Sequence, residues 1–273
     1  MSYGHFEPDG VYWRVNQEIT VLFGGVRALL MHAAHPLVAA GARQTATYRR
    51  DPWHRLLRTL SLQLLLGFGT TDEANRAADR INRLHTVING IDPVTGRRYD
   101  ALDPDLLLWV HACLEQSSVM FYEKTVGPLD GVELKQYHED NLVAAELVLL
   151  DREDVPPTYE ALEEYIQRVI DSGDLIATDV ARELAHLVRG GPVPLHLKPI
   201  WRFVSFAAVG TLPSEIRRLY GYTWGAARQK ALDLSFATLK RVRPWLPPRF
   251  RYVLPAQVAR RRQAGEEVEM PRP

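Results

Sequence analysis

Two arginines and a threonine stand in a segment that is otherwise apolar, "DPWHRLLRTLSLQLLLGFG", residues 51–69. At about 100° per residue of a helix, Arg55, Thr59 and Leu62 fall on one face, and Arg58 lies at its flank. Because a buried guanidinium needs a partner, such a face favours a bound anion. The alternative is that both arginines reach solvent or pair with nearby acidic residues. The residues alone leave both alternatives open.

His85 is a candidate iron ligand. It stands late in the next expected helix, on a stripe of inward positions spaced three and four apart. The stripe comprises Ala74, Ala77, Ala78, Ile81, Leu84, His85 and Ile88. An imidazole there is either a satisfied core residue or an axial ligand of haem, because small residues let the flat macrocycle approach. Arg55 and Arg58 on the adjacent helix would then pair with the haem propionates.

Two other pairs could bind metal. His32 and His35 are one helical turn apart, a spacing that lets two imidazoles bind one metal ion. The alternative is structural: both histidines are hydrogen-bonded near the break at Pro36. Glu183 and His186 form one of the two Glu-x-x-His pairs that a di-iron bundle needs; the alternative is an exposed helix face. Nucleotide-binding glycine motifs and a serine elbow are absent.

The elements that would position these residues are helices, because helix signals recur and strand signals are scarce. The sequence therefore predicts an all-α fold. The expected helices are residues 11–23, 26–48, 52–66, 71–90, 104–124, 130–149, 158–171, 174–189, 198–210 and 213–242. Pro36 is expected to kink or split the second of these near His35.

Capping residues predict where several helices begin. Asp51 is expected to cap a helix with Pro52 in its first position, and Asp103 to cap the long apolar helix that follows. Thr71, followed by two acidic residues, is expected to cap the helix that carries His85. The stretch "DPVTGRRYDALDP" is interpreted as a turn-rich connection.

Composition narrows the class of function. The 273 residues include 33 Lys and Arg against 33 Asp and Glu, so the totals lack the basic excess of nucleic-acid or anionic-membrane binding. Small molecules or protein partners are favoured. Cys113 is the sole cysteine, which excludes an intrachain disulfide and suits a reducing cytosol.

Segment boundaries give further expectations. The amino-terminal residues lack a secretory pattern, and the two most apolar segments are interrupted by charged residues or proline, so they are interpreted as buried helices and not membrane spans. A cytoplasmic location is expected. Residues 1–258 are expected to form a single-domain helical bundle, and residues 259–273 a charged, flexible tail at the surface.

Ordered landmarks across most of residues 20–225 resemble a known family. They are "RALLMHAAHP", "DPWHRLLRT", "GFGTTDEANRAADRINRLH", "ALDPDLLLWVHACL" and "LPSEIRRLYGYTW". The family is that of the rubber oxygenase called latex clearing protein and of the oxygenase of mycophenolic acid biosynthesis, formerly a domain of unknown function. The resemblance implies haem b in a helical, globin-like core.

The resemblance assigns roles to four residues. His85 takes the place of the proximal iron ligand, and Arg55 and Thr59 match a signature close to the haem. Arg58 stands where some relatives have a lysine that can cap the iron. Because a guanidinium stays protonated, Arg58 is a poor iron ligand, and the resemblance implies an open or water-bound sixth position.

One departure bears on the substrate. The rubber enzyme is thought to use a carboxylate upstream of the signature as a base, whereas residues 36–50 of this chain contain no acidic residue, which argues against polyisoprene cleavage. The resulting hypothesis is an intracellular haem b-dependent oxygenase or oxidase of a small apolar metabolite. O2 would bind opposite His85, with Arg58 and Thr59 as catalytic residues. The alternatives are a haem carrier or gas or redox sensor without turnover, and a helical protein that has lost its cofactor.

Overall fold

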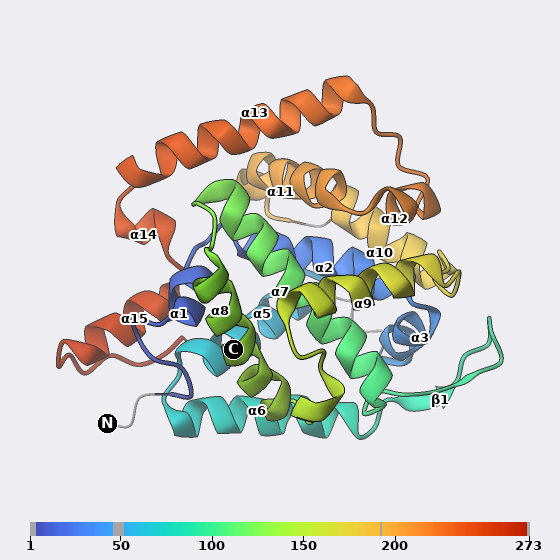
Figure 1. Cartoon of the computed structure of the whole chain (residues 1–273), viewed down its shortest axis with the longest axis horizontal. Coiled ribbons are helices and arrows are strands. Elements are labelled where there is room, and N and C mark those ends of the chain that lie inside the picture. Colours follow the sequence, from blue (N-terminus) through green and yellow to red (C-terminus); the bar gives the residue numbers. More distant parts are fainter. Residues whose placement is uncertain (1–3, 46–51, 192, 272–273) are drawn as a thin grey trace.

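The fold is helical, as the sequence predicts (Figure 1). The computed structural model describes residues 4–45, 52–191 and 193–271, and only the backbone of residues 52–56. Within these ranges, the only sheet is a two-stranded antiparallel one that pairs Asn89–Ile91 with Arg98–Asp100. The all-α prediction is therefore confirmed.

The elements follow one another in this order. They are α1 (Val11–Asn16), α2 (Leu22–Ala34), α3 (Pro36–Thr45), α5 (Pro52–Phe68), α6 (Thr71–His85), β1 (Asn89–Ile91), β2 (Arg98–Asp100), α7 (Pro104–Thr125), α8 (Gly131–Leu147), η1 (Arg152–Asp154), α9 (Tyr159–Asp171), α10 (Asp179–Gly190), η2 (Leu195–Leu197), α11 (Lys198–Thr211), α12 (Ser214–Leu219), α13 (Ala226–Val242), η3 (Arg243–Trp245), α14 (Pro248–Arg251) and α15 (Leu254–Gln263).

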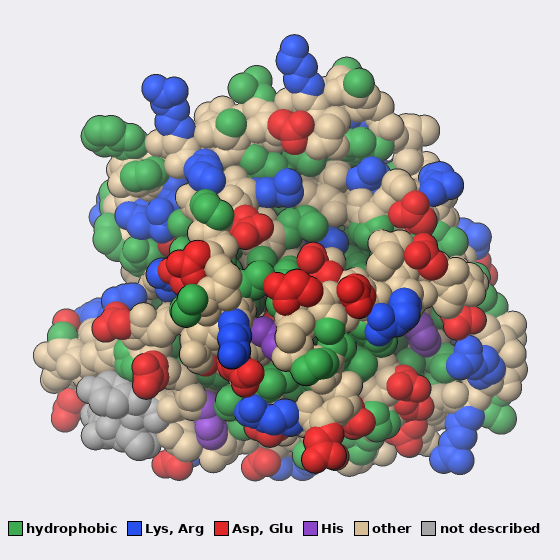
Figure 2. Space-filling view, viewed as in Figure 1, with side chains coloured by type: hydrophobic (Ala, Val, Ile, Leu, Met, Phe, Trp, Pro, Cys, Tyr) green, Lys and Arg blue, Asp and Glu red, His purple; other side chains and the backbone are tan. Residues whose placement is uncertain are grey.

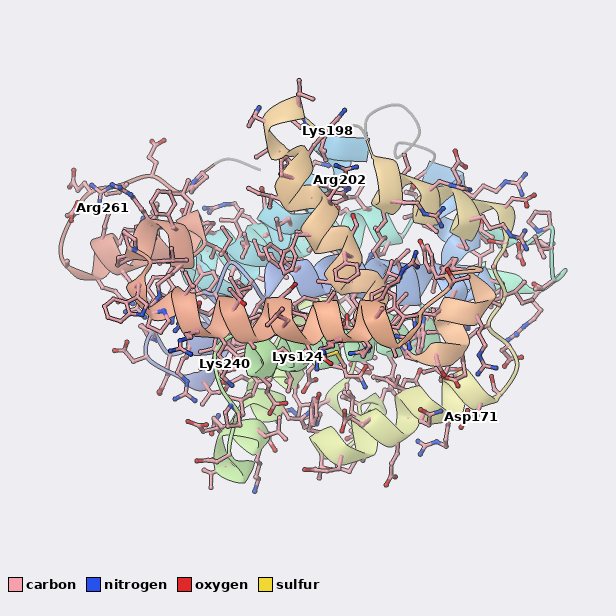
Figure 3. The ribbon with its side chains drawn as sticks, turned by 90° about the horizontal axis from the view of Figure 1, so that it is seen from above. Lys124, Asp171, Lys198, Arg202, Lys240 and Arg261 are labelled. Atoms are coloured by element: carbon pink, nitrogen blue, oxygen red, sulfur yellow. The ribbon has the colours of Figure 1, made fainter. Side chains whose placement is uncertain are left out.

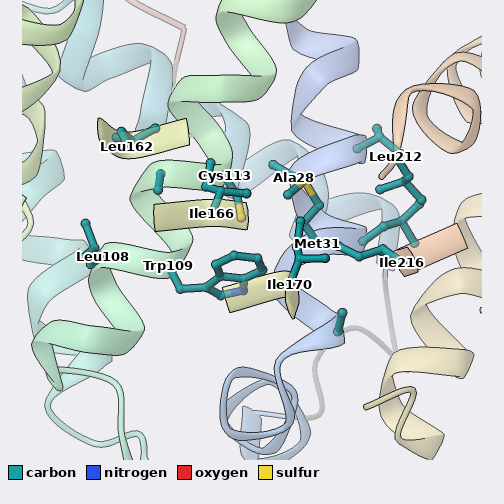
Figure 4. Close-up of a cluster of buried hydrophobic side chains, with 14 of the residues drawn as sticks. Ala28, Met31, Leu108, Trp109, Cys113, Leu162, Ile166, Ile170, Leu212 and Ile216 are labelled. Carbon is teal, nitrogen blue, oxygen red and sulfur yellow. The ribbon is translucent and has the colours of Figure 1, made fainter. Parts of the chain in front are cut away.

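Helix α2 is central, because α7, α11, α10 and α3 all pack against it. Gly24 lets α7 approach closely, since a Cβ atom built there would lie 2.8 Å from the carbonyl oxygen of Ser117. Figure 4 shows the apolar core around this contact, where α2, α7, α9 and the end of α11 meet. Cys113 lies in this core without exposure, and burial raises the pKa of its thiol.

A buried cation joins these helices. The Arg27 side chain donates from Nε to the carbonyl oxygen of Thr211 (3.0 Å), from Nη1 to Ser117 Oγ (2.6 Å) and from Nη2 to Gln116 Oε1 (2.9 Å). Burial lowers the pKa of Arg27 to about 10, so the side chain is still charged at neutral pH. The guanidinium has all of these hydrogen-bond acceptors only when α2, α7 and the end of α11 are packed together.

A second buried polar group joins α7, α8 and the segment before α9. His138 Nδ1 lies 2.8 Å from Glu115 Oε1, and His138 Nε2 lies 2.9 Å from the carbonyl oxygen of Pro156. A carbonyl and an ionised carboxylate both accept, so the imidazolium form of His138 satisfies both contacts. His111 Nε2 lies 3.5 Å from the other carboxylate oxygen.

Several helix boundaries differ from the sequence-based expectations. Residues 26–48 do not form one helix, because α2 ends at Ala34, His35 is extended as residues before proline usually are, and α3 begins at Pro36. The helix expected over 71–90 ends at His85. Part of the expected turn-rich connection is a β-hairpin. The helix expected over 213–242 is two helices, α12 and α13, separated where Gly221 adopts a φ of +69°.

The carboxyl-terminal residues make several contacts with the rest of the chain. Helix α15 continues to Gln263, Ala259 is buried, and Met270 is 8% exposed. Arg262 forms an ion pair with Glu73 at the start of α6, with Nη1 2.8 Å from Oε2. These apolar and ionic contacts anchor the segment on the helices beside it. The single domain expected over residues 1–258 and the flexible tail expected over residues 259–273 stay predictions.

None of the described helices is by itself long and apolar enough to cross a membrane. Helices α2 and α3 meet the length and composition only as a pair, and they bend by 105° at the break between them. Most of α2 is buried inside the protein. The sequence-based interpretation of that segment as a buried helix is confirmed.

We expect the His138 pair to make folding depend on pH. Burial lowers the pKa of His138, but the hydrogen bond and charge of Glu115 outweigh it, so the pKa rises above 6.5. The stabilisation is therefore complete below about pH 6.5 and is lost as the pH rises through the folded-state pKa. His138→Gln should cost about 3 kcal/mol at acidic pH and less at alkaline pH, as measured by urea unfolding. A cost that grows with pH would contradict this assignment.

Candidate functional site

Helices α5 and α6 carry four of the sequence-predicted site residues and pack against each other. Only Gly69 and Thr70 separate the two helices along the chain, so the end of α5 lies beside the start of α6.

The turn between the two helices sets this alignment. A Cβ atom on Gly69 would lie 2.6 Å from the carbonyl oxygen of Leu65, so only glycine fits there. Thr70 caps α6, since its hydroxyl accepts from the Glu73 amide at 3.3 Å and the Glu73 carboxylate accepts from the Thr70 amide at 2.9 Å. The predicted cap, Thr71, is therefore wrong by one residue, and Thr71 is the first residue of the helix.

His85 is half-buried at the last position of α6, and its Nδ1 atom is buried without a hydrogen-bond partner. Burial lowers the pKa of His85 below 6.5, so the imidazole is neutral at pH 7. One turn earlier, Asn82 donates to the carbonyl oxygen of Leu147 at 3.0 Å, but its Oδ1 is buried and unpartnered. Neighbouring positions of one helix thus hold two unsatisfied polar atoms.

The expected inward stripe on α6 is only partly buried. Ala74, Ala77 and Ala78 are each 5% exposed or less, whereas Leu84 is 43% exposed and does not face the core. His85 follows the stripe at half burial. The small side chains therefore line the first half of α6, and the histidine stands where the helix reaches the surface.

Helix α3 and the β-hairpin hold the chain that follows His85. Gln44 donates from Nε2 to the carbonyl oxygen of Val87 at 3.0 Å and accepts from the Tyr99 hydroxyl at 3.2 Å. Gly41 faces Ile88, since a Cβ atom there would lie 3.0 Å from Ile88 Cγ2. Sequence reasoning missed these neighbours, because nothing in their local pattern indicates a contact with α6.

Arg58 and Thr59 are exposed on α5, which agrees with the alternative that the arginine reaches solvent. Arg58 makes no ion pair within the described part of the chain. The side chain of Arg55 and the expected cap Asp51 lie outside the described residues. The structure thus leaves the Arg58 cation exposed on α5 and a neutral, half-buried His85 at the end of α6.

The two histidines of the α2–α3 break have different environments. His32 Nε2 lies 3.0 Å from the carbonyl oxygen of Val110, and burial lowers the pKa of His32 to about 4. A neutral ring that donates to a carbonyl links α2 to α7, which favours the structural interpretation. His35 has a buried, unpartnered Nδ1 and a pKa that burial lowers.

Glu183 and His186 stand one turn apart on α10. His186 is exposed on α10, and Glu183 is half-buried. Among the described residues, no group of three or more His, Cys, Asp or Glu side chains could hold a metal ion. His85 therefore belongs to no such group of ligands within the described ranges.

Comparison with known proteins agrees with these landmarks. Residues 12–242 match the family described as "ER-bound oxygenase mpaB/B'/Rubber oxygenase, catalytic domain". Uncharacterized proteins of Mycobacterium bovis and Mycobacterium tuberculosis are each 25% identical over 228 residues, which cover 81% of this chain and 88% of the relative. No solved structure matches significantly.

We expect Thr70→Ala to lower the free energy of unfolding by about 1 kcal/mol, because the α6 amides lose their cap. Thr70→Ser is the matched control, since serine keeps the accepting oxygen and should retain most of the stability. Urea unfolding of both variants measures the difference. Equal losses in the two variants would contradict the capping role.

Proposed function

This chain belongs to the mpaB/rubber oxygenase family, and from that premise we propose that it is a haem b-dependent oxygenase in which His85 would hold the iron. The substrate we propose is a small apolar metabolite, oxidised with O2. The observation that carries the proposal is the half-buried, neutral imidazole of His85 with its unpartnered Nδ1.

The residues around His85 fit a haem. Iron binds the neutral form of imidazole, and burial keeps His85 in that form at neutral pH. The second ring nitrogen of an axial histidine usually donates to a nearby acceptor, and the unpartnered Oδ1 of Asn82 lies one turn away on the same helix. Haem bound here would supply the iron that activates O2.

The cations of α5 fit the acidic groups of the same cofactor. Arg58 is exposed and makes no ion pair within the described residues, so its guanidinium is available for a propionate. Arg55 lies on the same helix. Arg58 could alternatively donate a hydrogen bond to the reacting groups, and Thr59 offers a hydroxyl beside it.

The chain's own residues limit the substrate. Residues 36–50 contain no carboxylate that could act as a base upstream of α5, which supports a substrate other than polyisoprene. Ala77 and Ala78 belong to an apolar cluster of the core beside α6. These apolar surroundings support an apolar metabolite.

We expect protein purified from haem-supplemented cells to show a Soret band and about one haem per chain. His85→Ala should lose most of that absorption, because the axial ligand is gone, whereas the control His186→Ala, at an exposed histidine, should keep it. The pyridine haemochromogen assay measures the haem content. Full haem content in His85→Ala would overturn the ligand assignment.

We further expect ferric wild-type protein to have a high-spin spectrum, because Arg58 cannot bind iron. Arg58→Lys should convert part of it to a low-spin form at alkaline pH, since a deprotonated lysine can bind iron, and Arg58→Gln should not. Absorption spectra across pH measure the change. A wild-type low-spin spectrum that Arg58→Gln abolishes would contradict an open sixth position.

Turnover separates the oxygenase from a haem carrier or sensor. A catalyst should consume O2 when a reductant and an apolar alkene or phenol are present, as measured with an oxygen electrode. Ligand-dependent spectra without O2 consumption across such substrates would favour the carrier or sensor.

A further inference from the structure

The charges of this neutral chain are unevenly distributed. Residues 234–265 contain no Asp or Glu but eight Lys or Arg residues. They are Lys240, Arg241, Arg243, Arg249, Arg251, Arg260, Arg261 and Arg262. The equal totals of acids and bases over the whole chain conceal this segment, so the expectation that there is no basic footprint does not hold locally.

Some of these cations have acidic partners from other segments. Arg243 pairs with Glu18, Arg262 with Glu73 and Arg261 with Glu266. Arg260 lies 3.7 Å from a carboxylate oxygen of Asp9. The acid-free segment is thus anchored to the body of the protein by some of its own charges.

Three other cations of the segment are exposed without an acidic partner among the described residues. Lys240 donates only to the carbonyl oxygen of Glu123, at 3.4 Å. Arg249 lies over the Phe250 ring, with its guanidinium carbon 4.9 Å from the ring centroid. Arg241 has no ionic contact within the described part of the chain. These charges are available to an external anion.

Large apolar side chains are exposed beside these cations. Val242 is 45% exposed, Trp245 85%, Phe250 55% and Leu254 58%. All four fall within 13 consecutive residues, over the end of α13, η3, α14 and the first residue of α15. We call Lys240, Arg241, Val242, Trp245, Arg249, Phe250 and Leu254 the basic-apolar edge.

The basic-apolar edge lies at one side of the molecule. Figure 1 shows α14 and the adjoining end of α13 on that side, and Figure 2 shows basic and apolar side chains mixed over them. Seen from above, Lys240 and Arg261 lie toward the same end (Figure 3). A groove of about 400 Å³ adjoins the edge; its lining includes Ile19, Leu64, Arg249 and Leu254.

We propose that the basic-apolar edge binds the surface of an anionic phospholipid bilayer. Exposed tryptophan and phenylalanine insert at the boundary between headgroups and acyl chains, and unpaired Lys and Arg attract anionic headgroups. The groove beside the edge offers an apolar recess at the same level. The occupant is a lipid surface because aliphatic Val242 and Leu254 are exposed together with the aromatic rings, whereas nucleic acid would use rings and cations alone.

This surface is independent of the proposed haem site. All residues of the edge after Val242 lie beyond residues 12–242, which match the family. None of the edge residues lies on α5 or α6. The haem content of edge variants should therefore equal that of the wild type, so failure of either proposal can be recognised separately.

The test is co-sedimentation with vesicles. Wild-type protein should bind vesicles of phosphatidylcholine mixed with phosphatidylglycerol, and should bind pure phosphatidylcholine vesicles much more weakly. Raising the salt from about 0.1 M to about 1 M shortens the screening length from about 10 Å to about 3 Å and should release most of the protein. Equal binding to both vesicle types, or to neither, would overturn the proposal.

Paired variants locate the surface. Arg241→Glu with Arg249→Glu should weaken binding about tenfold or more, because each cation near an anionic surface contributes about fivefold. Trp245→Ala with Phe250→Ala should weaken it in low salt as well. The matched control, Lys135→Glu with Lys198→Glu, reverses exposed charges on α8 and α11 and should bind like the wild type beyond a small general effect.

Two outcomes would contradict the assignment to lipid. Equal losses in the control and in Arg241→Glu with Arg249→Glu would show a nonspecific charge effect. Salt-sensitive binding to duplex DNA without vesicle binding would assign the edge to nucleic acid. Because every substituted side chain is exposed, unchanged circular dichroism and melting temperature should accompany all of these variants.

Discussion

The fold depends on the permanent charge of Arg27 inside a helical core. Its guanidinium is satisfied by a carbonyl and two side-chain oxygens from α7 and α11, so these helices take fixed positions around α2. The bend at Pro36 then turns α3 away from α2 and lays it against the residues that follow His85. A polar constraint in the core is thereby linked to the position of the candidate ligand.

Local sequence signals predicted the helices whose ends are chemically marked. Asp103 and Pro104 open α7 as expected, and proline accounts for the break between α2 and α3. The cap of α6 was misassigned because Thr70 and Thr71 are adjacent and both can cap; only the position of Glu73 relative to Thr70 decides. The β-hairpin and the contacts of the carboxyl-terminal residues depend on segments that are distant in the sequence, so local sequence patterns do not predict them.

The sequence predicted the inward position of His85 better than it predicted the residues around it. A stripe of small residues leads to His85, and the structure half-buries that imidazole. The sequence left open whether the polar face of α5 meets solvent or a bound anion, because helical periodicity does not tell which turns of a helix are covered by other elements. Gln44 and Tyr99 reach the site through tertiary contacts alone.

The burial of Cys113 has a consequence for the chemistry that we propose. Oxidation of a cysteine needs an accessible thiolate, and the sole thiol of this chain is both unexposed and held in its protonated form. Peroxide or superoxide released by an imperfect turnover would therefore find no reactive thiol on this protein. The same protection makes the chain a ready background for attaching a single spectroscopic label through an introduced surface cysteine.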